Sequence, residues 1–144
     1  MKVVLRQAFR EDIPGMHAVR RAVRENKLIS DAIREEHYVP AIESTGRGWI
    51  IEEDETVVAF AVGNAETGNI WALFVHPEHE GKGYGKKLQD TMIRWLFDKG
   101  LTRVYLSTAP GTRAQSFYEA TGWKFTGIDS RGEATYERDA PVDS

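Results

Sequence analysis

The segment from Leu73 to Leu88 constrains the fold of this chain more than any other part of the sequence. A strand-like run ends at Pro77, three alternating glycines follow, and a helical repeat of apolar residues begins directly after them. Glycine tolerates positive φ angles and allows the backbone to approach a ligand closely. The N-terminus of the following helix carries unpaired N–H groups and a partial positive charge. The pattern therefore predicts an anion site, suited to a phosphate or a diphosphate.

Two familiar phosphate-binding loops do not fit these residues. The dinucleotide-binding pattern G-x-G-x-x-G needs glycine where the chain has Lys86. The Walker A pattern needs glycine in place of Glu80, and serine or threonine in place of Lys87. Lys82, Lys86 and Lys87 add positive charge to the loop. On the glycines alone, a glycine-rich turn without a ligand stays open as the alternative.

Strand and helix patterns alternate along the rest of the chain. Composition and turn residues predict strands at 2–8, 49–52, 56–62, 70–75, 103–108, 123–128 and 134–138. Apolar spacing predicts helices from Asp12 to about residue 25, at 35–43 with a disturbance at Pro40, from the glycines to Gly100, and at 113–121. Glycines 46 and 48 are expected to end the second helix. Short links between the second, third and fourth strands favour antiparallel pairing, so the fold class is α+β, a mixed α/β sheet with helices on its faces.

Length, charge and cysteine content exclude several classes of protein. The 144 residues suffice for one domain. A net charge of −3, from 19 Lys and Arg against 22 Asp and Glu, argues against a nucleic-acid-binding protein. We expect no membrane span, because no stretch reaches roughly 18–20 apolar residues, and no signal peptide. The chain has no cysteine, which excludes disulfides and suits a reducing cytoplasm, the compartment that we expect.

A metal site is not expected either. Two histidines and two glutamates lie in the run from His76 to Glu80, directly before the glycines. Pro77 prevents the helix on which an H-E-x-x-H metal site depends, and no such motif is present.

Two motifs of the chain resemble those of the GNAT N-acetyltransferases. The run Glu80-Gly81-Lys82-Gly83-Tyr84-Gly85 is similar to the acetyl-CoA signature Gln/Arg-x-x-Gly-x-Gly/Ala, with glutamate in the position usually held by glutamine or arginine. The run from Thr112 to Trp123 is similar to the second motif, since it contains an Arg-Ala pair, a Phe-Tyr pair and a Gly-aromatic ending. The resemblance implies a GNAT-like single domain over residues 1–140 with a short tail at 141–144. Such a domain has a central, mostly antiparallel twisted sheet of about seven strands, flanked by about four helices.

The resemblance also implies acetyl-CoA as cosubstrate and a site for it. Backbone groups of Phe74 and Val75 would bind its pantetheine arm and thioester oxygen, where the fourth strand separates from the fifth. Tyr118 matches the general acid that protonates the leaving thiolate. A core position beside Phe117 is the alternative for this tyrosine. The loop would hold the diphosphate, mainly through backbone amides, and comprises Glu80, Gly81, Lys82, Gly83, Tyr84, Gly85 and Lys86.

The acceptor side is less defined by the sequence. By the resemblance, the segment at 24–30 overlies the acceptor, and Arg24, Glu25 and Asn26 would help to select the amine. Arg20 belongs to a basic run on the first helix, which is typical of a solvated helix face.

The general base is left open. The strand at 69–75 carries no acidic residue, and Glu25, His17 and His76 are candidates to which we assign no role. The sequence thus predicts an enzyme that transfers an acetyl group from acetyl-CoA to a primary amine of a small molecule or peptide, by direct attack in a ternary complex. The alternative is a non-catalytic acyl-CoA-binding or regulatory module, which Glu80 favours and Tyr118 opposes. The family resemblance also allows a homodimer.

Overall fold

The computed structural model describes residues 1–23 and 33–141 of the chain. Within these residues it contains seven strands, four α-helices and two short 3-10 helices, in the predicted order. The strands are β1 (Val3–Gln7), β2 (Gly46–Glu53), β3 (Thr56–Asn64), β4 (Ile70–Val75), β5 (Arg103–Thr108), β6 (Lys124–Ile128) and β7 (Ala134–Asp139). The helices are η1 (Arg10–Asp12), α1 (Ile13–Ala22), α2 (Glu35–Glu43), η3 (Pro77–His79), α3 (Tyr84–Asp98) and α4 (Arg113–Ala120).

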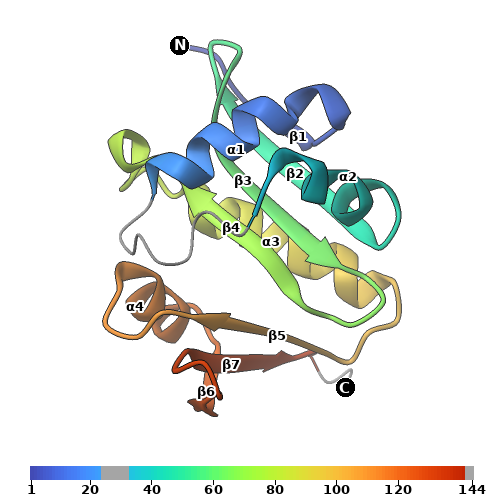
Figure 1. Cartoon of the computed structure of the whole chain (residues 1–144), viewed down its shortest axis with the longest axis vertical. Coiled ribbons are helices and arrows are strands. Elements are labelled where there is room, and N and C mark those ends of the chain that lie inside the picture. The colour runs from blue at the N-terminus through green and yellow to red at the C-terminus, as the bar shows by residue number, and fades with distance from the viewer. Residues whose placement is uncertain (24–32, 142–144) are drawn as a thin grey trace.

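The strands form two antiparallel sheets (Figure 1). One has the order β1-β2-β3-β4 and the other the order β5-β7-β6. A parallel bridge between Asn69 and Tyr105 joins them, and the amide of Tyr105 donates to the carbonyl of Gly68 at 3.0 Å. Beyond this point β4 and β5 are not paired, so the layer is divided between the fourth and the fifth strand, as the resemblance implies.

A bulge interrupts β4 near its start. Trp71 is an extra residue there, because Ile70 and Ala72 pair with consecutive residues of β3. A bulge bends its strand and changes the direction of neighbouring side chains. This irregularity is not predicted from the sequence, because the run 69–75 contains neither glycine nor proline.

Helices cover both faces of the four-stranded sheet (Figure 1). On one face α3 packs through Leu88 and Met92, which are fully buried. On the other face α1 and α2 pack through Met16 and Tyr38, also fully buried. β4 contributes to both faces: Leu73 and Val75 pack on the side of α3, and Trp71, Ala72 and Phe74 pack on the side of α1 and α2.

Some element boundaries differ from the prediction. β2 begins at Gly46, where the sequence analysis expects the end of the preceding helix. A Cβ atom at Gly46 would lie 1.8 Å from the carbonyl oxygen of Gly63, so this glycine permits close contact between β2 and β3. Pro40 lies inside α2 without ending it. α1 ends at Ala22, and the predicted extension from residue 24 onwards lies outside the described residues.

Candidate active site

A cavity of about 860 Å³ occupies the region where the two sheets separate. Its walls come from β4, the glycine loop and the start of α3, the end of β5, and α4. Arg20 and Val23 add a wall from the side of α1. The cavity is therefore lined from both faces of the layer, and it brings the two sequence motifs together.

The glycine loop presents main chain to this cavity. Gly83 has a φ angle of +82° and forms the N-cap of α3 without any side-chain capping bond. A Cβ at Gly83 would meet no atom within 4 Å, so the backbone angle and not the available space requires glycine here. The first bond within the helix runs from the amide of Lys87 to the carbonyl of Gly83, at 3.2 Å. The preceding amides of Tyr84, Gly85 and Lys86 thus have no acceptor within the helix, and all three residues line the cavity.

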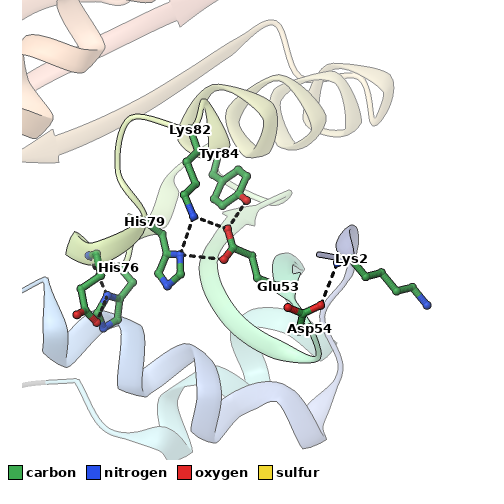
Figure 2. A network of polar contacts seen from close by, with 8 residues as sticks. Lys2, Glu53, Asp54, His76, His79, Lys82 and Tyr84 are labelled. Atoms are coloured by element: carbon green, nitrogen blue, oxygen red, sulfur yellow. Dashed lines mark hydrogen bonds and ion pairs between the residues drawn. The ribbon is translucent and has the colours of Figure 1, made fainter.

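The side chains of Lys82, Tyr84 and Lys86 contact carboxylates. Lys82 Nζ donates to Glu53 Oε2 at 2.8 Å, and the hydroxyl of Tyr84 donates to the same oxygen (Figure 2). His79 Nδ1 lies 3.1 Å from Glu53 Oε1. The ammonium of Lys86 pairs with Asp90 at 2.8 Å. Two of the lysines that are expected to add positive charge to the loop, Lys82 and Lys86, are therefore each paired with a carboxylate.

Glu53 organises this network from the end of β2. Only 8% of its surface is exposed, and it is separated from Lys82 and Tyr84 by 29 and 31 residues in the sequence. The hydrogen bonds from Lys82 and then Tyr84 lower the pKa of Glu53 to about 2. Glu53 is thus ionised at neutral pH and holds the residues on either side of Gly83. Its role is not predicted from the sequence, although Trp49, Ile51 and Glu53 alternate on one face of β2.

Glu80, the residue that departs from the signature, pairs with Arg113. Arg113 Nη1 donates to Glu80 Oε1 at 3.1 Å. Both residues line the cavity, so the pair connects the glycine loop with the first residue of α4. The cation balances the charge that Glu80 brings to the loop. The pair is largely exposed, and exposed pairs contribute little to stability.

Tyr118 of α4 also lines the cavity. Its side chain is 6% exposed, and its ring packs edge-on against Phe117 and Trp123. Burial raises the pKa of its phenol above the ordinary value of 10.0, so the hydroxyl carries its proton at neutral pH. Tyr118 is therefore packed in the core and also lines the cavity.

Phe74 and Val75 line the cavity from β4. β4 is an edge strand of its sheet, paired with β3 on one side only. Past the bridge at Asn69, no strand of the described chain pairs with its other edge. Main-chain groups along this edge are hence available to a ligand in the cavity.

The acceptor residues named from the sequence are not placed. Arg24, Glu25 and Asn26 lie outside the described residues. Arg20 was expected on a solvated helix face, which is wrong, because it is partly buried and lines the cavity. His17 Nδ1 lies 3.2 Å from the hydroxyl of Tyr38, and burial lowers its pKa.

Two carboxylates line the described part of the cavity wall, and both are engaged. Glu80 pairs with Arg113, as described above. Glu133, which the sequence analysis did not single out, accepts a hydrogen bond from Ser107 Oγ at 3.0 Å and lies 3.5 Å from Arg131 Nη2. His76 is not on the described wall; its Nδ1 accepts from the amide of Glu78.

Two further features of the described residues bear on function. No group of three or more His, Cys, Asp or Glu side chains in residues 1–23 and 33–141 is arranged to hold a metal ion. Over the same residues, no helix combines the length and apolar character that crossing a membrane requires.

A sequence model of the acetyltransferase (GNAT) family matches residues 6–123. The chain superposes on the PaiA N-acetyltransferase of Thermoplasma acidophilum, crystallised with coenzyme A, with a TM-score of 0.82 and 18% identity over 97% of this chain and 100% of that one. It superposes on YncA of Salmonella typhimurium, a structure with its cofactor acetyl-CoA, with a TM-score of 0.79 and 17% identity over 95% and 93% of the two chains.

A curated relative matches a shorter segment. An uncharacterised N-acetyltransferase of Prochlorococcus marinus, described as ycf52-like, is 44% identical over 54 residues, which are 38% of this chain and 29% of that protein. The chain matches less than a third of the length of its curated relatives.

Proposed function

This chain belongs to the GNAT family of acetyltransferases, and we propose that its residues 1–140 form a domain that transfers the acetyl group of acetyl-CoA to a primary amine. The acceptor is the amine of a small molecule or a peptide, and it attacks directly in a ternary complex.

The cavity carries this proposal. It joins the free amides at the start of α3 to the unpaired edge of β4 and to Tyr118. A volume of about 860 Å³ lies within the range of roughly 300–1,000 Å³ that is typical of ligand sites.

The residues present fit acetyl-CoA, which supplies an acetyl group activated as a thioester. Amides at the N-terminus of a helix suit the charge of a diphosphate. The open edge of β4, at Phe74 and Val75, offers main-chain partners to the amide groups of a pantetheine arm. Glu80 does not oppose this arrangement, because Arg113 neutralises it at 3.1 Å. From Gly81 to Lys86, we assign the binding to the main chain and not to the side chains.

Tyr118 is assigned the role of general acid. When the new C–N bond forms and the C–S bond breaks, the sulfur leaves with an electron pair and needs a proton. Burial keeps the phenol of Tyr118 protonated at neutral pH, so a proton is available to the thiolate. The thiol that forms has a pKa of about 8.5, below that of the phenol, so the transfer is uphill, and water returns the proton to the phenolate. The proton that the amine loses passes to water in this proposal, because the two described carboxylates on the wall are already paired.

Two measurements test the proposal. Calorimetric titration with CoA and acetyl-CoA measures binding, and release of free thiol with a panel of amines measures transfer. Binding together with amine-dependent thiol release supports an acetyltransferase. Binding without thiol release on any amine favours a non-catalytic acyl-CoA-binding module, and absence of binding contradicts both.

Two broader expectations remain part of the proposal. A cytoplasmic location is supported by the absence of cysteine from the chain, and fractionation of cells that produce the protein tests it. A homodimer is supported by the family resemblance, and sedimentation velocity tests it.

A further inference from the structure

Arg20 is held in an aromatic box on the cavity wall, on the face of the layer opposite α3. The centre of its guanidinium lies 4.8 Å from the ring of Trp71 and 4.9 Å from that of Phe74. Its Nε donates to the hydroxyl of Tyr38 at 2.9 Å. Trp71 and Phe74 line the same cavity. Stacking and the hydrogen bond together fix the plane of the guanidinium, so its remaining edge has a defined direction.

That edge lacks a partner within the described chain. Arg20 Nη2 is buried, and it donates to no acceptor among residues 1–23 and 33–141. Arg6, Arg10 and Arg113 each pair with a carboxylate, whereas no such pair is found for Arg20 in the same part of the chain. A buried donor without an acceptor is costly, and more so when it is charged. The wall therefore carries a positive charge that a ligand in the cavity can neutralise.

The charge of Arg20 lies away from the glycine loop, where the coenzyme is proposed to bind. Trp71 and Phe74 pack on the side of α1 and α2, whereas the glycine loop leads into α3 on the other face. The diphosphate site proposed above already has its own main-chain donors. Arg20 thus lies at the other end of the cavity wall, where the proposed function requires an acceptor.

We propose that Arg20 binds a carboxylate of the acceptor, so that the amine acetylated here belongs to a molecule that also carries a carboxylate. This inference rests on the proposed function and specifies its substrate class. A guanidinium presents two parallel N–H donors that match the two oxygens of a carboxylate. The same charge disfavours acceptors that are purely cationic, such as linear diamines.

The test compares matched amines in the presence of CoA, which carries no acetyl group. The titrants are 3-aminopropanoate, 4-aminobutyrate and 6-aminohexanoate, each with its primary amide, and the diamine 1,4-diaminobutane. Calorimetry on the wild-type protein with CoA is expected to show, for at least one chain length, binding of the carboxylate at least 10-fold tighter than that of its amide. Thiol release with acetyl-CoA should show the same preference in kcat/KM.

Two variants assign the preference to this residue. Arg20→Met keeps a long apolar stem in the aromatic box and should reduce the ratio of carboxylate to amide to about 1, while the affinity for CoA stays within 2-fold. Arg21→Met changes an exposed neighbour on the same helix and should leave the ratio as in the wild type. Retained CoA binding shows that each variant is folded.

The outcomes of this test are distinct. Equal binding of carboxylates and amides by the wild type, or a preference that survives in Arg20→Met, overturns the inference. If the wild type does not bind CoA, the proposed function fails instead, and the same titration into the protein alone still tests the carboxylate site.

Discussion

The two ends of the cavity are built from different parts of the polypeptide. At the glycine loop, residues with free main-chain amides line the cavity, and the side chains of Lys82 and Tyr84 are turned towards Glu53. At the other end, the wall consists of side chains, with Arg20 stacked between residues of β4 and α2. A main-chain site needs only a short local pattern of residues that permit one backbone conformation. A side-chain site depends on the packing of several elements that lie far apart in the sequence.

Gly83→Val should produce the largest effect, because it tests the main-chain end directly. Valine is strained at a φ angle of +82°, so the loop must change its conformation. Losing two charge-assisted N–H bonds, each worth roughly 1.5–3 kcal/mol, weakens CoA binding by about 150-fold or more. Calorimetry with CoA measures this loss.

Gly100→Val is the matched control for this variant. Gly100 has a φ angle of +101°, equally open surroundings, and lies beyond the other end of α3. Both variants should lose similar thermal stability, and only Gly83→Val should lose CoA binding. Wild-type affinity in Gly83→Val would show that the main chain of this turn is not the binding element.

Tyr118→Phe examines the chemistry between the two ends. Removal of a general acid typically lowers the rate by about 100-fold or more, so kcat should fall by that factor while the affinity for acetyl-CoA stays within about 3-fold. Tyr136→Phe is a suitable control, because Tyr136 is a buried tyrosine whose ring lies 6.1 Å from that of Tyr118, and it is not part of the described cavity wall. A proportional loss of kcat and affinity in Tyr118→Phe would indicate packing alone.

Glu53→Ala tests whether the main-chain end of the cavity depends on a side chain. Glu53 does not line the cavity, but it binds two side chains of the glycine loop. We expect the KM for acetyl-CoA to rise about 10-fold, with kcat within 2-fold, because Lys82 and Tyr84 lose their common acceptor. Glu53→Gln, which keeps an oxygen acceptor, should recover part of this loss. Glu52→Ala is the control, because Glu52 is the neighbour of Glu53 on β2 and pairs with Arg6 of β1 instead. Unchanged KM in Glu53→Ala would mean that the loop holds its shape unaided.

The smallest expected effect is the pH dependence that Glu53 gives to the stability of the fold. Hydrogen bonds lower the pKa of Glu53 from 4.5 to about 2, so its stabilising contribution is complete above pH 4.5 and is lost as the pH falls towards 2. Urea unfolding should therefore show that the wild type exceeds Glu53→Gln in stability at pH 6, and that this difference shrinks between pH 4.5 and 2.5. A difference that is constant over this range would contradict the role of ionised Glu53.

The comparison also explains what the sequence could predict. The order of elements and the helix after the glycines followed from glycine spacing and apolar periodicity, which are local properties, and the anion site at this helix stays a prediction. The placement of Tyr118 on the cavity depended on the resemblance to a family. Glu53 could not be assigned in advance, because its partners are 29 and 31 residues away and become neighbours only when α3 packs on the sheet.

The acceptor end was the least predictable region for the same reason. Arg20 looked like one cation in a basic helix face, and only the bulge at Trp71 together with the packing of α1 on β4 brings aromatic rings to it. The start of β2 at Gly46 was predicted wrongly for a similar reason. Whether this glycine ends a helix or lies in a strand depends on its close contact with Gly63 of the neighbouring strand.

A crystal structure with bound acetyl-CoA tests the central claim most directly. The account predicts diphosphate oxygens within hydrogen-bond distance of amides between Gly81 and Lys86, the pantetheine along the open edge of β4, and the thioester sulfur beside the hydroxyl of Tyr118. A nucleotide bound outside this cavity, or a diphosphate held by lysine side chains with the amides of the loop unused, would contradict it.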